Sequence, residues 1–183
     1  MFDVKILPSG DSAVLIQLGS VISPQVNAAV HALDAGIKSA NINGIVETVP
    51  AFASLLVLYD PVVIGYEEIS GTLRAICENP TSVSERKSFL YTIPVCYGDE
   101  FGEDLEDVAA HAGMSADEVV RCHSERTYLI YMLGFLPGFP YLGGLDPAIA
   151  CPRLASPRQK IEAGSVGIGG EQTGVYPLAS PGG

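Results

Sequence analysis

The sequence predicts a protein in two parts, an N-terminal α+β domain over residues 1–84 and a mostly β domain over residues 88–183. In the first part, short apolar runs alternate with two stretches whose apolar residues recur at helical spacing. A polar, proline-containing segment without periodicity, residues 79–87, separates the two parts. After residue 126 the chain holds 11 of its 20 glycines and 7 of its 13 prolines. That composition is typical of short strands joined by shaped loops.

The first elements are two strands and a helix. Phe2–Leu7 and Ala13–Leu18 are apolar runs separated by a Pro-Ser-Gly-Asp turn. Ser23 and Pro24 then open a helix, because serine offers an N-cap oxygen and proline is tolerated in the first turn. One face of this helix is apolar, and we expect it to be buried: Val26, Ala29, Val30, Leu33 and Ile37.

Two more strands and a second helix complete the N-terminal part. Ile45–Val49 and Ser54–Tyr59 are predicted strands, and a helix follows over residues 66–78. Without the first strand, this order is most of a split βαβ, ferredoxin-like unit. We therefore expect an antiparallel sheet with its helices on one side.

The second part opens with a strand and two short helices. Phe89–Tyr97 is predicted to be a strand at an edge, because Pro94 lies inside it. Leu105–Ala112 is a helix that ends at a glycine. Ser115 begins a capping-box pattern, so we expect a second helix from Ser115 to about His123.

Composition and charge exclude several classes of function. A hydrophobic content of 48% is that of a globular chain, and a net charge of −11 argues against nucleic-acid binding. The sequence has no apolar run of membrane-spanning length, and charges within residues 1–20 argue against a secretory signal. We expect a cytoplasmic protein. The four cysteines are scattered without metal-ligand spacing, so the sequence predicts no metal site and buried, reduced thiols.

Standard catalytic motifs are missing. The sequence contains no G-x-x-x-x-G-K-[ST] phosphate loop, and the glycine-rich segment 164–174 does not meet the G-x-G-x-x-G spacing. No nucleophile elbow or His-Glu-x-x-His motif is present. Catalysis here must use a less standard arrangement, or be completed by another chain.

Two features of the C-terminal part could bind an anion. Arg153 and Arg158 each follow a proline, which holds the backbone ready for a bidentate contact with a carboxylate or phosphate. The alternative for each arginine is an ordinary surface ion pair. Backbone amides from Gly167 to Gly174, including that of Gly169, could also turn towards an anion. A plain hairpin is the alternative.

Other polar residues are candidates for catalysis or substrate binding. Gln172, with Glu171 and Tyr176 near it in the sequence, offers an amide, a carboxylate and a phenol that could bind the polar edge of a small amide substrate. His123 could serve as a general base. Its alternative is a cap or dipole partner at the helix C-terminus.

The C-terminal half carries a family signature. The segments are 131–145 (YMLGFLPGFPYLGGL), 157–158 (PR), 163–168 (AGSVGI), 172–174 (QTG), 176–177 (YP) and 180–183 (SPGG). Together they closely resemble the allophanate hydrolase subunit 1 family, and residues 93–97 (IPVCY) frame the same domain. The match is dense from about Ile93 onward and weaker over the N-terminal part.

This resemblance implies a cyclophilin-like β-barrel after the α+β domain. It also implies the position of the B subunit in a prokaryotic 5-oxoprolinase, which uses ATP to hydrolyse 5-oxo-L-proline to L-glutamate. The partners would be the A subunit and the C subunit of that enzyme, the latter a cyclophilin-like paralogue. Family members continue beyond the SPGG element, so we expect the barrel to be incomplete within these 183 residues.

In such an enzyme each candidate residue has a role. Arg153 and Arg158 would bind anions, while amides of residues 167–170 with Gln172 would orient the lactam. His123 or Glu171 would move protons, and Arg158, Gln172 and Tyr176 match motif positions of the family. ATP, with Mg²⁺, would bind at a partner or at the interface with it. The rival hypotheses are an inhibitor of a sporulation histidine kinase, which relatives include, and a component of an allophanate- or urea-processing enzyme.

Overall fold

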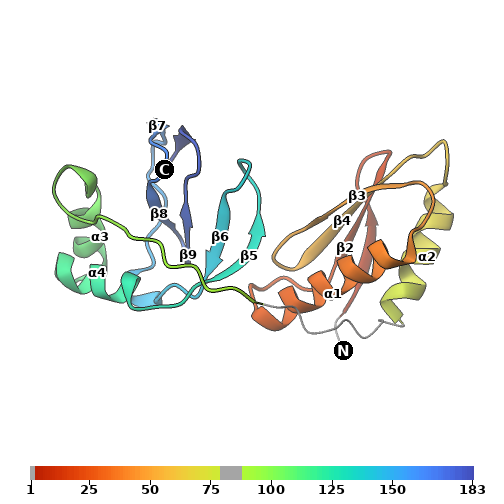
Figure 1. Ribbon diagram of the computed structural model, residues 1–183, viewed down its shortest axis with the longest axis horizontal. Coiled ribbons are helices and arrows are strands. Elements are labelled where there is room, and N and C mark those ends of the chain that lie inside the picture. The colour runs from red at the N-terminus through yellow and green to blue at the C-terminus, as the bar shows by residue number, and fades with distance from the viewer. Residues whose placement is uncertain (1–2, 79–87) are drawn as a thin grey trace. The chain divides into compact units, whose positions relative to one another are not determined.

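The computed structural model describes residues 3–78 and 88–183, and Figure 1 shows their helices and strands. The chain forms two compact units, Met1–Ser88 and Phe89–Gly183. The predicted linker, residues 79–87, lies outside the described residues. Each unit is a mixture of helices and antiparallel strands.

The N-terminal unit is built on a four-stranded antiparallel sheet. Its strands are β1 (Lys5–Pro8), β2 (Ala13–Gln17), β3 (Ile45–Pro50) and β4 (Ser54–Tyr59). They lie in the order β1-β2-β4-β3. All four were predicted, although the first begins at Lys5 and Phe2 lies outside the described residues.

Two helices, α1 (Pro24–Ala40) and α2 (Tyr66–Glu78), supply the rest of this unit's core. Their apolar residues and those of the sheet form one cluster that includes Val14, Ile16, Val30, Ile37, Leu55, Val57, Ile69 and Leu73. Each of these eight side chains is essentially inaccessible to water, in agreement with the predicted apolar strands and apolar helix faces.

The start of α1 differs in detail from the prediction. Ser23 occupies the N-cap, but its side chain makes no capping bond to the helix. Its hydroxyl instead donates to Gln25 Oε1 at 2.7 Å. Proline in the first turn removes one of the amides that would need a cap. The helix ends at Ala40, where Asn41 takes a left-handed conformation with φ of 46°.

In the C-terminal unit, helices α3 (Leu105–Ala112) and α4 (Ala116–Ser124) are joined by a short turn. Gly113 ends α3 in a left-handed conformation, and Ser115 and Glu118 form the predicted capping box. Short 3-10 turns lie at Asp99–Phe101 and Pro147–Ile149. The helices pack around a small core of four buried residues, Ala109, Val119, Leu145 and Ile149.

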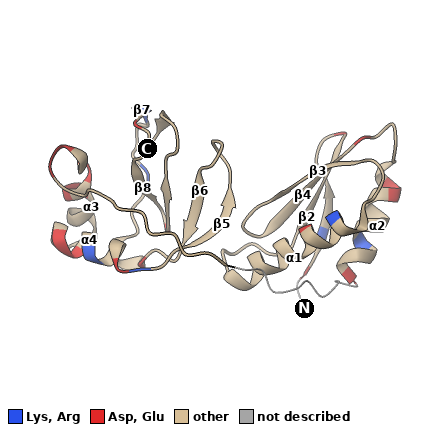
Figure 2. Cartoon of the chain, viewed as in Figure 1, with Lys and Arg blue, Asp and Glu red and all other residues tan. Residues whose placement is uncertain are grey.

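The strands of the C-terminal unit form two antiparallel sheets. The larger contains β5 (Leu129–Leu133), β6 (Pro140–Gly143), β8 (Val166–Gly169) and β9 (Gln172–Val175), in the order β5-β6-β9-β8. The smaller pairs β7 (Arg158–Ile161) with β10 (Ser180–Gly182). The ribbons of β5, β6 and β9 carry no charged residue (Figure 2).

Two predictions are wrong: the strand at Phe89–Tyr97 and the burial of the four cysteines. Phe89–Tyr97 is not a strand: it pairs with no described strand, and the side chains of Phe89, Leu90 and Tyr91 are more than 70% exposed. Pro94 has no N–H to give to a ladder. The cysteines are free, as expected, but none is fully buried, and Cys96 is exposed.

Glycines of the C-terminal motifs make room for aromatic rings. A Cβ on Gly174 would lie 2.7 Å from Phe139 Cζ, and a Cβ on Gly143 would overlap the ring of Tyr131. Tyr131 and Phe139 are both buried. Much of the glycine in the family signature therefore serves packing of rings against the sheet.

Within residues 3–78 and 88–183, no helix combines the length and the apolar character needed to cross a bilayer.

Candidate functional site

The candidate site is centred on the β8–β9 hairpin. Its two-residue turn, Gly170-Glu171, has φ of +63° at the glycine. Opposite residues of an antiparallel pair project to the same face of a sheet. The pairs Gly169–Gln172 and Gly167–Gly174 therefore share one face, and the pair Ile168–Thr173 shares the other.

The first face, which we call the arginine face, gathers Arg153, Gln172 and Tyr176 over Gly167 and Gly169. A Cβ on Gly169 would lie 3.3 Å from Arg153 Nε and 3.5 Å from its Cγ. A Cβ on Gly167 would lie 3.6 Å from the ring of Tyr176. Five of the eight predicted site residues thus meet on one surface, and the two glycines let the arginine and tyrosine lie close to the strand.

The two candidate arginines have different surroundings. Arg158 makes a bidentate pair with Asp104, at 2.6 and 2.7 Å, and Glu103 lies 3.5 Å away. The hydrogen bonds from Arg158 lower the pKa of Asp104, and the same contacts raise the pKa of Arg158. Arg153 is exposed, and no described side chain forms an ion pair with it. An incoming anion would have to displace Asp104 from Arg158, whereas Arg153 is accessible.

Tyr176 belongs to an aromatic group at the edge of the arginine face. Its ring centroid lies 5.1 Å from that of Phe139 and 6.3 Å from that of Phe135, both edge-on. A Cβ on Gly182 would lie 2.6 Å from Tyr176 Oη, so the phenol end is closely packed. Tyr176 therefore helps to build this surface, whether or not its hydroxyl contacts a ligand.

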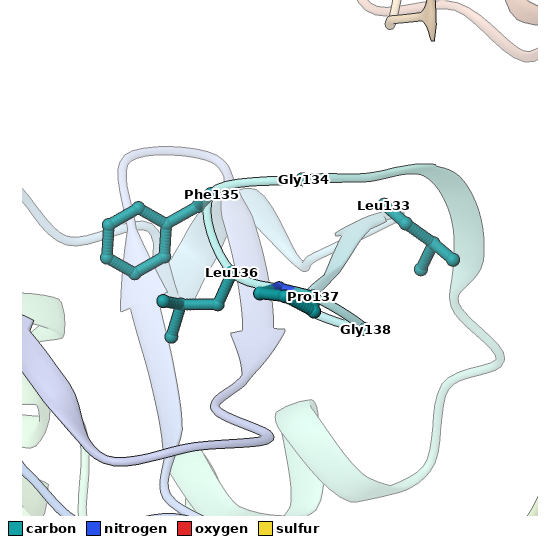
Figure 3. A pocket seen from close by; sticks show the side chains of 6 residues that line it. All are labelled: Leu133, Gly134, Phe135, Leu136, Pro137 and Gly138. Carbon is teal, nitrogen blue, oxygen red and sulfur yellow. The ribbon is translucent and has the colours of Figure 1, made fainter.

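Phe135 is the exposed member of the aromatic group. It lies in the β5–β6 loop, where residues Leu133–Gly138 line a hollow of about 300 Å³ (Figure 3). Its φ of +60° is strained for a bulky side chain, and its surface is 61% exposed. Strain of this kind persists where the surrounding structure enforces it, and it is common at functional sites.

The backbone amides of the hairpin do not form the predicted run of anion donors. Successive amides of an antiparallel strand point in opposite directions. The amide of Gly170 donates to Cys151 O at 2.8 Å. The plain-hairpin alternative describes this segment, and Gly167 and Gly169 contribute a flat surface to the site.

Glu171 is exposed at the tip of the turn, and it forms no ion pair with a described residue. Its neighbour Gln172 is half-buried.

His123 lies on the opposite face of the hairpin, which we call the histidine face. The residue is only 7% exposed. Its Nε2 lies 3.0 Å from Thr173 Oγ1, and its Nδ1 lies 2.6 Å from Tyr97 Oη. Burial lowers the pKa of His123. Both ring nitrogens are already hydrogen-bonded, and the ring is separated from the arginine face by the hairpin itself.

Sequence reasoning missed Tyr97 and Thr173, the two partners of His123. Thr173 lies in the QTG motif, but only the strand register reveals which face it projects from. Tyr97 ends a segment with no strand partner among the described residues. The contact of Tyr97 with His123 is seen only in the folded chain. Among the described residues, no group of three or more His, Cys, Asp or Glu side chains is placed to hold a metal ion.

Comparison with known proteins shows the family to which this chain belongs. Residues 4–183 match the family described as carboxyltransferase domain, subdomain C and D. The match spans nearly the whole chain, so the chain belongs to this family.

Two bacterial proteins are similar to this chain over most of its length. The chain is 46% identical over 185 residues to the 5-oxoprolinase B subunit of Bacillus subtilis (strain 168), a match that covers 95% of this chain and 77% of the relative. A protein of the same name from Escherichia coli O157:H7 is 39% identical, with 95% of this chain and 78% of the relative covered. The resemblance found in the sequence is confirmed.

A solved structure has the same fold over most of this chain. The crystal structure of TTHA0988 superimposes with a TM-score of 0.80 at 34% identity and covers 93% of this chain. This chain spans about a third of that one, 33% of its length.

Proposed function

We propose that this protein is the B subunit of an ATP-dependent 5-oxoprolinase, which hydrolyses 5-oxo-L-proline to L-glutamate together with its A and C subunits. The observation that carries the proposal is the 46% identity, over 95% of the chain, to a 5-oxoprolinase B subunit. ATP as co-substrate favours a cytoplasmic enzyme.

The arginine face supplies groups that suit this substrate. The guanidinium of Arg153 is an accessible donor for a carboxylate or a phosphoryl group. The amide of Gln172 can pair with the edge of a lactam, which has one donor and one acceptor. Phe135 and Tyr176 offer apolar surface for the five-membered ring. Arg158 stays a second anion-binding candidate that would first have to leave Asp104.

The chemistry requires activation of an unstrained lactam. Transfer of the terminal phosphoryl group of ATP to the lactam oxygen would give an activated imidate. Attack of one water on its carbon and breakage of the C–N bond would then give an open-chain acyl phosphate. A second water would hydrolyse this acyl phosphate, so that the products are glutamate, ADP and phosphate. Water needs a base, and Glu171 is the exposed carboxylate next to the arginine face. The His123 ring lies on the other face.

A partner chain is needed to complete such a site. The arginine face is open, and one accessible arginine with a glutamine is a small set of donors for a reaction with several anionic oxygens. The sequence holds no phosphate loop. We therefore place ATP, with Mg²⁺, at an interface with the A or the C subunit, and we expect the isolated chain to be inactive.

The two units also fit the expected fold families. In the N-terminal sheet, β1 pairs with β2 where the fourth strand of a ferredoxin-like unit would lie, and this pairing supports a permuted form of that fold. The two sheets of the C-terminal unit are consistent with part of a cyclophilin-like barrel.

The rivals are inhibition of a histidine kinase and a role in an allophanate- or urea-processing enzyme. Both relatives described above carry the name of the same 5-oxoprolinase component, which favours the first proposal. Inhibition of kinase autophosphorylation by the isolated chain would support the first rival. Release of ammonia from allophanate by the assembled complex would support the second.

Reconstitution tests the proposal. The A and C subunits from the same genome are purified with and without this chain, and glutamate formed from 5-oxo-L-proline and ATP is measured. We expect glutamate only when all three are present. Equal turnover without this chain would refute the proposal.

A further inference from the structure

His123, Tyr97 and Thr173 form a buried hydrogen-bond chain whose proton positions can be derived from its geometry. Thr173 Oγ1 donates its only proton to Gly167 O at 3.0 Å. The same oxygen lies 3.0 Å from His123 Nε2, so it must accept a proton from that nitrogen. The proton of the imidazole is therefore on Nε2.

The protonation state of the other ring nitrogen, Nδ1, then follows. With its proton on Nε2, a neutral imidazole has a lone pair on Nδ1. The hydroxyl of Tyr97 lies 2.6 Å from Nδ1 and donates to it. In the opposite tautomer, Thr173 would have to give its proton to the imidazole, and Gly167 O would lose this donor.

The same three side chains connect separate segments of the C-terminal unit. Tyr97 comes from the segment before α3, His123 from α4, and Thr173 from β9. A fourth bond, from Tyr128 Oη to His123 O at 2.7 Å, adds the residue just before β5. The imidazole is at the junction of all four segments.

We propose that His123 is a positioning residue, a neutral imidazole with its proton on Nε2 that fixes the β8–β9 hairpin through Thr173. Thr173 and Gln172 are adjacent on β9, so a bond that holds Thr173 also holds Gln172 in position. Gly169, which pairs with Gln172 and lies against Arg153, is held with them. A link to catalysis rests on the proposed function. The tautomer and the structural role do not.

The surroundings of the ring agree with a neutral state. Two phenols face the ring: that of Tyr97, whose pKa is raised by burial, and that of Tyr128, whose ring centroid lies 5.3 Å away. Neither bears a charge near neutral pH, and no described carboxylate forms an ion pair with the ring. Burial without a counter-charge opposes protonation.

The first test uses the wild-type chain alone. Its three histidines are labelled with ¹⁵N, and ring nitrogen shifts are followed by NMR from pH 8 to pH 5, with His123 assigned by its absence in His123→Gln. We expect a protonated Nε2 and an unprotonated Nδ1 for His123 at neutral pH and above. A proton on Nδ1 at neutral pH, or protonation of both His123 nitrogens near the ordinary histidine value of about 6.5, would overturn the proposal.

The second test separates positioning from general-base catalysis in the assembled complex. In His123→Gln, the amide can donate to Thr173 and accept from Tyr97, but it cannot accept a proton from water. Loss of a general base costs at least about 100-fold in turnover. We expect His123→Gln to lose much less than that and to keep the pH profile, with a larger loss in His123→Ala. Equal and severe losses in both variants would overturn the positioning role.

The two proposals fail differently. An inactive wild-type complex would refute the 5-oxoprolinase function while leaving the NMR result to stand. A His123 that titrates near the ordinary histidine value in an active complex would refute the positioning role alone.

Discussion

At the scale of single residues, the two candidate arginines differ by what already surrounds them. Arg158 is neutralised by Asp104 and Glu103, and its contact connects β7 to the start of α3. Arg153 has no such partner among the described residues and lies against Gly169. The same residue type, each placed after a proline, therefore serves a structural ion pair at one position and an accessible cation at the other.

The ion pair can be tested by a double-mutant cycle on Arg158→Gln and Asp104→Asn. Both side chains are partly exposed, at 38% and 41%, so solvent weakens the pair. We expect each single change to lower the free energy of unfolding by roughly 0.5–1 kcal/mol. The double variant should lose little more than either single variant, because the pair is already broken by one change. Urea unfolding measures all four proteins.

The activities of the same variants decide the role of Arg158. If the ion pair is its whole role, both single variants lower turnover of the reconstituted complex by the same small factor. If Arg158 also binds substrate or phosphate, only Arg158→Gln loses activity while the complex still assembles. That second outcome would show that Arg158 is an anion ligand.

His123 predicts a dependence of stability on pH. Burial lowers its pKa in the folded state, so below about 6.5 the unfolded chain takes up a proton that the folded chain does not. Its contribution to stability is fully present above that pH and is lost as the pH falls towards the folded-state pKa. We expect the free energy of unfolding to drop between pH 7.5 and 5.5 in the wild type, and less in His123→Gln.

Urea unfolding at the two pH values measures the difference. Carboxylates common to both proteins, such as Asp104, lose their contribution only at lower pH and cancel in the comparison. An identical drop in both proteins would mean that His123 is not held neutral by the fold.

At the scale of elements, the arginine face depends on glycines that let other groups approach the strands. Gly174 is the sharpest case, because a Cβ there would contact Phe139 Cζ at 2.7 Å and Pro140 O at 3.2 Å. We expect Gly174→Ala to destabilise the C-terminal unit by about 1–3 kcal/mol, the usual cost of overpacking.

Gly98→Ala is the matched control for that change. Gly98 lies in the same unit, has φ of −106°, and has no atom within 4 Å of the position of a Cβ. Thermal unfolding of the two variants compares them directly. A Gly174→Ala protein as stable as Gly98→Ala would show that the ring of Phe139 moves aside at no cost.

Much of the element structure was predictable because local signals agree with the fold. Short apolar runs bounded by turn residues predicted β2 and β4, helical spacing predicted α1 and α2, and the capping box predicted the start of α4. The exception, Phe89–Tyr97, has the composition of a strand, but strand structure requires a neighbour that composition does not supply.

The candidate site was predictable as a set of residues but not as an arrangement. Arg153, Gln172 and Tyr176 were proposed together, and the structure brings them to one face. Placing His123 on the other face needed the register of β8 against β9. A one-residue change in that register would exchange the two faces, so no local pattern could have decided it.

At the scale of the whole molecule, the arrangement suits a protein whose site is finished by a partner. The net charge of −11 resides in residues 1–126, whereas the C-terminal residues that carry the arginine face are neutral in sum. An exposed arginine with a half-buried glutamine and an exposed phenylalanine forms an open surface. A second protein would exclude water from it and strengthen each polar contact.

We propose that this chain supplies the anion-binding surface of a 5-oxoprolinase through Arg153. The most direct measurement is the rate of glutamate formation by the complete complex carrying Arg153→Gln, beside one carrying Arg74→Gln, which removes an exposed arginine from α2 of the other unit. We expect a loss of at least about tenfold, the equivalent of one charged hydrogen bond, for Arg153→Gln and unchanged turnover for the control. Equal rates in the two assembled complexes would contradict the claim.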